Sequence, residues 1–241
     1  ASAIRTGGTL YYVAAGSSGL MAAADAQELG GTFSIPAHQL RILMAGGLPS
    51  GVEMPGGTED DISNLGDALS EISGADTVVA VSASGTTPFT LEAANVAKAR
   101  GATIVAIANN PGSPLLDLAD QAICLPTPAE VLSGSTRLGA GTAQKIALNT
   151  LSTLMAIDLG HVHDGMMVNL RADNIKLRAR ALGMVSRIAA VSEAAASDAL
   201  EAANGRVKPA VLIAKGLAPD AAQALLRETE DNLRAALARL N

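Results

Sequence analysis

The chain has 241 residues, of which 49% are apolar, and its formal net charge is −6 at pH 7. This length suits one large α/β domain, or one such domain with a small appendage. Tyr11, Tyr12, Phe33 and Phe89 are its only aromatic residues, and lysine and arginine form no dense block. The sequence therefore offers neither a basic face nor a stacking platform for nucleic acid. No apolar run reaches the roughly 20 residues that a membrane span needs.

Cys124 is the only cysteine, so the chain cannot form an internal disulfide. It lies in a strand-like run at residues 122–125, where we expect a core residue rather than a nucleophile. A single reduced cysteine, with no charged-then-apolar signal sequence at the start, predicts a cytoplasmic protein.

Five short apolar runs, most of them rich in β-branched residues, predict the buried strands of a parallel sheet. They lie at residues 9–14, 41–45, 78–81, 103–108 and 121–125. Helical patterns separate them, and connections of this length predict right-handed crossovers. The fold class is therefore α/β, as a three-layer α/β/α doubly wound five-stranded parallel sheet. In such sheets ligands bind at the carboxyl ends of the strands.

Two loops rich in serine and glycine stand at those ends. One is Gly-Ser-Ser-Gly at residues 16–19, and the other is Ser-Ala-Ser-Gly-Thr-Thr at residues 82–87 before Pro88. Backbone N–H groups and a helix dipole converge at such positions, and hydroxyl side chains add further donors to a bound phosphate. A simple helix cap would need only one hydroxyl, that of Thr87. We interpret the two loops together as an anion site.

Two further segments carry acidic residues. Thr58 is expected to cap a helix that runs to about Ile72, with Glu59 and Asp60 stabilising its first turn. Glu130 lies in the connection that leads into a long helix, which we expect to stop at Gly160 and to be largely buried. Small residues at 139–143 allow the start of this helix to approach a ligand or a partner subunit closely.

The rest of the chain predicts an irregular segment at residues 164–171 and then a small helical bundle. Asp173 is expected to cap the first helix, whose lysines and arginines form a solvated face, and further helices follow up to residue 241. His161 and His163 flank the end of the long helix, where we expect them to complement its dipole. No histidine spacing supports a zinc site. We place the domain boundary between residues 182 and 183.

Several runs resemble the N-acetylmuramic acid 6-phosphate etherases, which belong to the sugar isomerase (SIS) domain superfamily. The resemblance covers nearly the whole chain and implies the SIS fold, no cofactor, a sugar-phosphate ligand and a homodimer whose neighbouring subunit completes the site. The two serine–glycine loops resemble phosphosugar-binding loops. The runs closest to the etherases are residues 16–28, 45–47, 58–60, 129–137, 140–145 and 166–181.

The resemblance also implies roles for individual residues. Two etherase carboxylates match Glu28 and Glu59, one as the acid that protonates the ether oxygen and the other as the base that removes the C2 proton. From spacing alone, Glu28 would be a solvated residue near the end of a helix, and Glu59 would be a first-turn residue that stabilises the helix dipole. Glu130 corresponds to a glutamate used for ring opening or proton shuttling in related isomerases. The sugar phosphate would contact Ser17, Ser18, Ser82, Ser84, Gly85, Thr86, Thr87 and Ser135.

The implied reaction eliminates lactate from an open-chain aldehyde and then adds water, giving N-acetylglucosamine 6-phosphate and D-lactate. Leu20, Thr86 and Gly139 depart from the pattern, because the etherases usually carry arginine, arginine and lysine there. Each lost charge-assisted contact costs about 1.5–3 kcal/mol. Two alternatives stay open: an aldose–ketose phosphosugar isomerase that uses one glutamate as base, and a non-catalytic sugar-phosphate-binding regulator.

Overall fold

The computed structural model describes residues 1–240, and its contacts divide the chain into two compact units. The first, which we call the α/β unit, comprises Ser2–Glu28 and Pro36–Ser152. The second, the helical unit, comprises Leu29–Ile35 and the chain from Thr153 onward, together with Ala1. The domain boundary between residues 182 and 183 stays a prediction. No helix in residues 1–240 is both long enough and apolar enough to cross a membrane.

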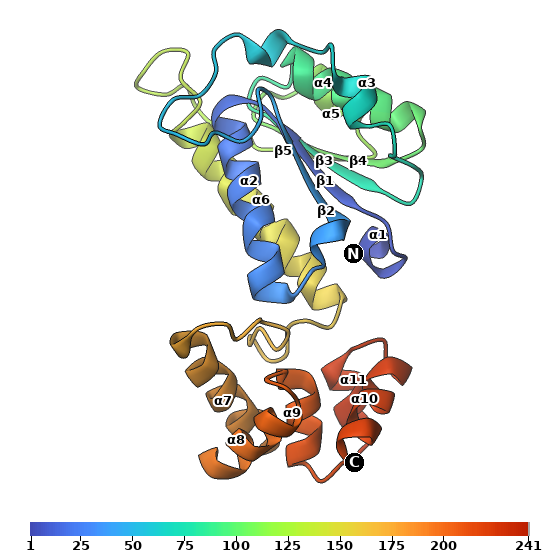
Figure 1. The fold of residues 1–241 in the computed structure, drawn as a ribbon. Coiled ribbons are helices and arrows are strands. Elements are labelled where there is room, and N and C mark those ends of the chain that lie inside the picture. The colour runs from blue at the N-terminus through green and yellow to red at the C-terminus, as the bar shows by residue number, and fades with distance from the viewer. Residues whose placement is uncertain (241) are drawn as a thin grey trace. The chain divides into compact units, whose positions relative to one another are not determined.

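A five-stranded parallel sheet forms the centre of the α/β unit (Figure 1). The strand order is β2-β1-β3-β4-β5, with every neighbouring pair parallel. The sequence therefore predicted the fold class and all five strands correctly. The strands are β1 Leu10–Ala14, β2 Leu40–Met44, β3 Thr77–Ser82, β4 Thr103–Ala108 and β5 Gln121–Cys124.

Helices cover both faces of this sheet (Figure 1). Alternate side chains of the strands point to opposite faces, so Tyr11 and Val13 pack in the cluster under α4, whereas the Tyr12 hydroxyl bonds to Asp25 of α2. One face carries α2 Gly16–Phe33 and α6 Gly139–Asp158, and the other α3 Leu65–Ala68, α4 Pro88–Ala99 and α5 Pro114–Leu118. The short α1 Ser2–Arg5 precedes β1, and the 3-10 helix η1 Ala37–Gln39 precedes β2.

Two local predictions in this unit are wrong. The Gly-Ser-Ser-Gly segment is the first turn of α2 rather than a loop before it. The helix predicted from Thr58 to Ile72 is broken into the 3-10 helix η2 Thr58–Asp60 and the one-turn helix α3. Between them the Asp61 carboxylate accepts hydrogen bonds from the backbone N–H of Ser63 at 3.0 Å and from its hydroxyl at 2.7 Å. Such local side-chain bonds compete with helix formation.

Cys124 is exposed, so the prediction that it lies in the core is also wrong. It is the last residue of β5, an edge strand in which Gln121 and Ala122 are also exposed. An apolar run of four residues does not reveal whether its strand is central or at an edge.

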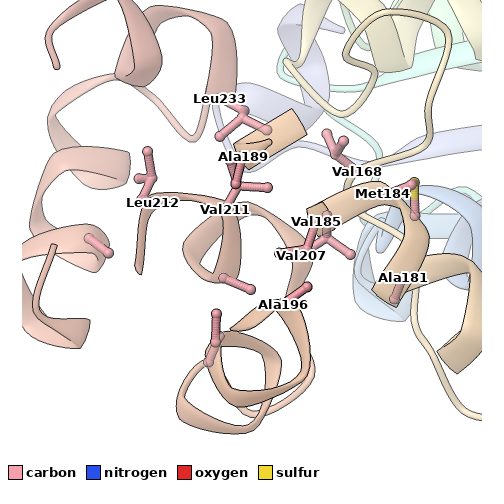
Figure 2. Packing of buried hydrophobic residues seen from close by; sticks show 14 of the residues in the cluster. Val168, Ala181, Met184, Val185, Ala189, Ala196, Val207, Val211, Leu212 and Leu233 are labelled. Carbon is pink, nitrogen blue, oxygen red and sulfur yellow. The ribbon is translucent and has the colours of Figure 1, made fainter. Parts of the chain in front are cut away.

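As predicted, an irregular segment follows α6 and a helical bundle follows that segment. The described residues of the bundle form five helices, because the stretch expected to be helical from Pro219 onward is divided into two. Val168, Val185 and Val211 lie in its buried core with residues from each helix (Figure 2). The cap of the first helix is Asn174 rather than Asp173, because the Asn174 side chain accepts a hydrogen bond from the Leu177 N–H. Asn241, the last residue of the predicted bundle, lies outside the described residues. The helices are α7 Ile175–Ala189, α8 Glu193–Ala202, α9 Val207–Ala214, α10 Pro219–Glu228 and α11 Leu233–Ala238.

His161 does not complement the dipole of α6 as predicted. Burial, assisted by the nearby Lys208 ammonium, lowers the pKa of His161 to about 4, so its ring is neutral at pH 7. Its Nδ1 atom lies 3.0 Å from Lys208 Nζ and serves as an acceptor there. Burial also lowers the pKa of His163, although Asp164 opposes this shift.

Candidate functional site

The loop between β3 and α4 is held by a network of its own hydroxyl groups. Ser82 Oγ lies 2.8 Å from Thr87 Oγ1 and 3.3 Å from Ser84 Oγ, and it accepts a hydrogen bond from the Gly85 N–H at 3.0 Å. Ser84 Oγ accepts from both the N–H and the hydroxyl of Thr86, at 3.1 and 3.0 Å. The loop is therefore shaped before any ligand arrives, with its hydroxyls gathered together.

Gly85 and Thr87 show that this loop is more than a helix cap. Gly85 has a φ of 71°, and a Cβ atom there would lie only 2.1 Å from Ser113 Oγ, so a larger residue does not fit. Thr87 is the N-cap residue of α4, but its hydroxyl makes no capping bond. The Thr87 side chain therefore does not cap the first-turn N–H groups of α4. The positive end of the α4 helix dipole faces the loop.

Ser17 and Ser18 lie at the same edge of the sheet as this loop. They belong to the first turn of α2, which follows β1, and β1 pairs with β3 so that Ala14 stands beside Val81. Ser18 is buried, and Ser17 Oγ lies 3.3 Å from Thr136 Oγ1. Two helix N-termini with serine side chains thus converge at the carboxyl ends of neighbouring strands, as the sequence predicted for an anion site.

Glu59 reaches this edge from a distant part of the chain. A Cβ atom on Gly16 would lie 2.5 Å from Glu59 Oε1, so the carboxylate rests directly against the backbone at the start of α2. Its helix η2 also packs against α4. Glu59 therefore stands at the N-terminus of α2, where the positive helix end favours a carboxylate, on a segment that contacts α4.

Glu130 caps the start of α6. Its carboxylate accepts hydrogen bonds from the backbone N–H groups of Leu138, at 3.0 and 3.2 Å, and of Ala140, at 3.2 Å. Desolvation raises the pKa of Glu130, but these bonds and one from the Ser135 side chain outweigh it, and the net shift is downward. Ser135 thus contacts Glu130, and the contact between Thr136 and Ser17 connects this segment to α2.

Glu28 is the one candidate that the fold does not bring to this edge. It is exposed on α2, and at 1.5 Å per residue it lies about 16 Å further along the helix axis than Ser17. The structure thus places Glu59 against the start of α2 and connects the Glu130 segment to Ser17, but it leaves Glu28 apart within one chain.

The three positions that lack the expected cations also lie at this edge. Leu20 is exposed one turn into α2, and Thr86 is exposed on the hydroxyl-rich loop. A Cβ atom on Gly139 would lie 3.9 Å from Glu130 Oε1. Nowhere in residues 1–240 do three His, Cys, Asp or Glu side chains gather closely enough to hold a metal ion.

Sequence reasoning missed a buried carboxylate on α2. Asp25 accepts hydrogen bonds from Tyr12 Oη at 2.7 Å, from Asn149 Nδ2 at 2.6 Å and from Ser152 Oγ at 2.8 Å. Burial, followed by the charge of Asp25, raises the pKa of Tyr12, so this phenol remains a donor. Asp25 joins β1, α2 and α6, and its signal in the sequence is an acid that follows directly on a run of three alanines.

A second missed group fixes α6 to the ends of two strands. Gln144 Nε2 donates to Asn109 Oδ1 at 2.8 Å, and Asn109 Nδ2 donates to the Leu125 carbonyl at 3.0 Å. Gln144 and Asn109 are both buried. Their bonds hold the carboxyl edge of the sheet against the helix that carries the Glu130 cap.

Comparison with known proteins identifies the family of this chain. Residues 58–159 match the SIS domain family. The N-acetylmuramic acid 6-phosphate etherase of Deinococcus radiodurans is 46% identical to this chain, and the match covers 92% of this chain and 74% of the etherase. The proteins of the same name from Symbiobacterium thermophilum and Streptomyces avermitilis are 42% and 41% identical, over 88% and 96% of this chain and 71% and 76% of theirs. The chain therefore belongs to the N-acetylmuramic acid 6-phosphate etherase family, within the SIS domain proteins.

Proposed function

We propose that this protein is a phosphosugar lyase, which cleaves the lactyl ether of N-acetylmuramic acid 6-phosphate or a close relative. The products are N-acetylglucosamine 6-phosphate and D-lactate. The names of relatives at 41–46% identity support this activity. The structural observation that carries it is the position of Glu59, whose carboxylate rests on the start of α2 beside two phosphate-type loops.

The phosphate group is assigned to the loop at the start of α4. Ser82, Ser84 and Thr87 offer hydroxyl donors, and the N-terminus of α4 offers backbone N–H groups. Ser18, at the start of α2, lies on the adjacent side of the same edge. Because the hydroxyls already bond to one another, binding exchanges these bonds for bonds to the phosphate rather than ordering a flexible loop.

The chemistry requires two groups with opposite proton states. A base removes the C2 proton, which the neighbouring aldehyde makes acidic, while an acid protonates the ether oxygen as the bond from C3 to that oxygen breaks. Water then adds across the new double bond, with its hydroxyl on C3 and its proton on C2. Glu59 is assigned one of these two roles. Glu130, whose lowered pKa keeps it ionised, is assigned to ring opening or proton transfer.

Glu28 is assigned to the site of a second copy of the chain. Its distance of about 16 Å along α2 from Ser17 places it out of reach of its own chain's loops. A homodimer with shared sites brings the two glutamates together. The exposed apolar side chains of Ile146, Leu154 and Ile157, which recur along α6 at helical spacing, support such an interface. A cytoplasmic location remains a prediction.

One observation favours a second candidate, the non-catalytic sugar-phosphate-binding regulator. The substrate carries both a phosphate and a lactyl carboxylate, yet Leu20, Thr86 and Gly139 leave three expected cations absent from this edge. If those cations hold the lactyl carboxylate in place, this chain would bind the sugar phosphate without turning it over.

The test is D-lactate release from N-acetylmuramic acid 6-phosphate by the purified protein. Wild-type protein and the control Glu71→Gln, which changes an exposed glutamate, are expected to release lactate, whereas Glu59→Gln and Glu28→Gln are not. Substrate binding without lactate would identify a regulator. A ketose product without lactate would identify an isomerase.

Mixing the two inactive variants tests the shared site. In a heterodimer of Glu28→Gln with Glu59→Gln, one site carries both substitutions and the other carries neither. Random pairing at equal amounts therefore restores about one quarter of wild-type activity. A mixture that stays inactive, although heterodimers form, would show that each chain supplies its own pair of glutamates.

A further inference from the structure

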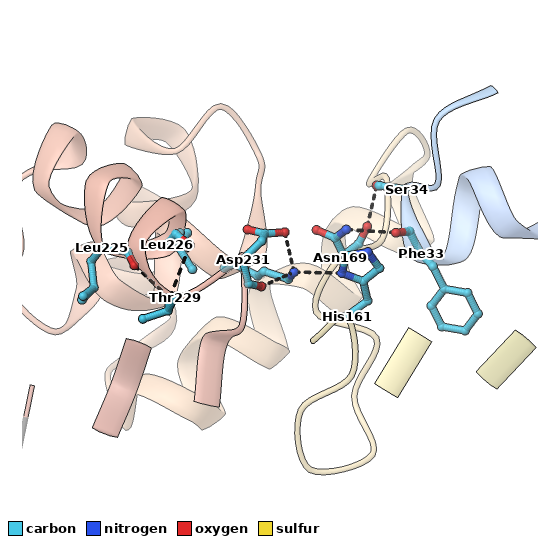
Figure 3. Close-up of polar contacts among 9 residues, drawn as sticks. Phe33, Ser34, His161, Asn169, Leu225, Leu226, Thr229 and Asp231 are labelled. Atoms are coloured by element: carbon cyan, nitrogen blue, oxygen red, sulfur yellow. Dashed lines mark hydrogen bonds and ion pairs between the residues drawn. The ribbon is translucent and has the colours of Figure 1, made fainter. Parts of the chain in front are cut away.

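A cavity of about 560 Å³ lies within the helical unit, in a part of the chain to which the proposed reaction assigns no role. Its walls come from residues 34, 168–173, 204–209 and 231. The Ser34 hydroxyl donates to the Asn169 carbonyl at 2.5 Å, and Asn169 Nδ2 donates to the Phe33 carbonyl at 2.9 Å (Figure 3). These bonds fix one wall, so the cavity is built into the unit.

A buried cation forms part of another wall. Lys208 is only 1% exposed. Its ammonium group donates to the Asp231 carboxylate at 2.6 Å and to the Asp231 carbonyl at 2.7 Å, and it lies 3.0 Å from His161 Nδ1 (Figure 3). These three partners use all three of its protons. Lys208 therefore contributes a fixed positive charge to the wall without offering a donor to a ligand.

Two arginines on the same cavity have no partner. Arg171 and Arg206 both line it, and neither guanidinium makes a hydrogen bond or ion pair with another of the residues 1–240. In the same unit Arg234 lies 2.6 Å from Asp164 and Arg239 lies 3.0 Å from Glu228. The exposed Arg180 and Arg227 also lack a partner among residues 1–240, so what sets Arg171 and Arg206 apart is that they line the cavity. Both side chains are exposed, and Arg171 Nη2 lies against Gly30, where a Cβ atom would come within 2.8 Å of it. Their N–H donors are therefore available to a ligand at this cavity.

The charges around the cavity do not balance. Burial lowers the pKa of Lys208, its pairing with Asp231 opposes this, and the positive charge of Arg206 adds to the lowering. Asp231 is already engaged by Lys208, and Asp173 is the other carboxylate on the lining. Three cations therefore line the cavity with two carboxylates, and an anion bound there would offset the repulsion between Arg206 and Lys208.

We propose that this cavity binds the phosphate group of a small phosphorylated metabolite, with Arg171 and Arg206 as its ligands. The planar guanidinium fork matches phosphate oxygens in paired hydrogen bonds. The volume lies in the range of small-molecule sites. The amide side chains of Asn169 and Asn204, which also line the cavity, are suited to the hydroxyl groups of such a molecule.

The experiment is a titration of the ¹⁵N-labelled 241-residue chain, followed residue by residue by NMR. Inorganic phosphate and N-acetylglucosamine 6-phosphate are added separately, and the signals observed are the Nε–H groups of Arg171 and Arg206 and the amide of Val207. Saturable shifts at these positions are expected. Residue-level signals separate this cavity from the loop at Ser82, so the outcome does not depend on the proposed enzymatic activity.

Matched variants test the two arginines. Substituting both Arg171 and Arg206 with alanine is expected to weaken binding at Val207 at least about tenfold. The control Arg180→Ala with Arg227→Ala removes two exposed arginines of the same unit that do not line the cavity, and it is expected to bind as the wild type does. Substituting both Arg171 and Arg206 with lysine keeps the positive charges but loses the planar guanidinium fork, so an affinity between those of the wild type and the double alanine variant is expected.

The remaining outcomes identify the ligand or overturn the proposal. Tighter binding of the sugar phosphate than of inorganic phosphate would identify an organic phosphate, and equal binding would identify phosphate itself. The proposal fails if neither compound gives saturable shifts at these positions. It also fails if the double alanine variant binds as tightly as its control, or if D-lactate binds more tightly than both phosphates.

Discussion

The α/β unit and the helical unit each bury a charged side chain, and they surround it with different partners. Asp25, 3% exposed, accepts hydrogen bonds from three uncharged donors on β1 and α6. Lys208, 1% exposed, is held by the carboxylate and carbonyl of Asp231 and by the neutral ring of His161. One charge is stabilised by dipoles from distant elements, and the other mainly by an opposite charge.

The difference predicts unequal consequences when either charge is lost. The Tyr12 hydroxyl, a donor to Asp25, is itself fully buried, so water cannot replace its acceptor. The Asp231 side chain is 40% exposed, so water can solvate it when Lys208 is absent. Buried donors left without an acceptor lower the folding stability more than a carboxylate that can be solvated by water. The α/β unit should therefore be the more sensitive of the two.

The largest effect is expected from Asp25→Ala, which leaves Tyr12 Oη and Asn149 Nδ2 without their acceptor, while Ser152 Oγ keeps the Asn149 carbonyl at 3.2 Å. Unfolding free energy is expected to fall by about 4 kcal/mol. Urea unfolding followed by tyrosine fluorescence measures this directly, because both tyrosines of the chain lie in β1. Asp67→Ala, at an exposed position, serves as the control and should change stability by no more than about 0.5 kcal/mol. A loss below 1 kcal/mol for Asp25→Ala would show that the three donors find other partners.

Lys208→Met is expected to cost less, about 2 kcal/mol, because the methionine keeps the apolar packing while Asp231 turns to water. Circular dichroism at 222 nm during urea unfolding is the measurement. Lys208→Arg keeps the charge but cannot place three donors as the ammonium does, so its stability should lie between the two. A Lys208→Met protein as stable as the wild type would mean that the ion pair contributes nothing net.

Acidification should destabilise the helical unit through His161. The pKa of His161 is about 4 in the folded protein, below its ordinary value of 6.5. The unfolded chain therefore takes up a proton between pH 6.5 and pH 4 that the folded chain refuses, and stability falls as the pH falls through this window. The expected loss is roughly 3 kcal/mol between pH 7 and pH 4. His161→Gln keeps an acceptor for Lys208 but cannot titrate, so its stability should depend less on pH; equal slopes for both proteins would exclude His161 as the cause.

The smallest effect is expected from Tyr12→Phe, which removes one of the three donors to Asp25. About 1 kcal/mol should be lost, because the carboxylate keeps its bonds to Asn149 and Ser152. Tyr11 remains as the fluorescent reporter in β1. If this substitution cost as much as Asp25→Ala, the tyrosine rather than the whole set of donors would hold the carboxylate in place.

Much of the fold was predictable because its signals are local. Residues 78–81 and 103–108 are short β-branched runs between turn signals, and such runs form buried parallel strands almost regardless of their partners. Once the strands were placed, topology alone required the serine-rich segments after β1 and β3 to meet at one edge. The meeting of Ser18 with the Ser82 loop at that edge followed from the sequence.

The misplaced elements depend on information that no local pattern holds. Whether Cys124 is covered depends on the order of strands in the sheet, and the contact of Glu59 with Gly16 depends on the path of a loop rich in glycine and proline. An aspartate at position 61 is compatible with the first turn of a helix, but the hydrogen bonds that its carboxylate accepts from Ser63 compete with helix formation there. Lys208 is recognisable in the sequence as the lone charged residue of an apolar helix, but no sequence pattern indicates that Asp231 is its partner.

The turn between α10 and α11 places two consecutive non-glycine residues in the left-handed region, Glu230 with a φ of 52° and Asp231 with a φ of 58°. Each costs about 1 kcal/mol in backbone strain. At Asp231 the bonds from Lys208 to its carbonyl and carboxylate offset this strain, so the residue cannot be exchanged freely. At Glu230 a glycine would adopt the same φ without that strain. The conformation of this turn is therefore coupled to α9 through Lys208, so α9 and the turn before α11 should open together in hydrogen exchange.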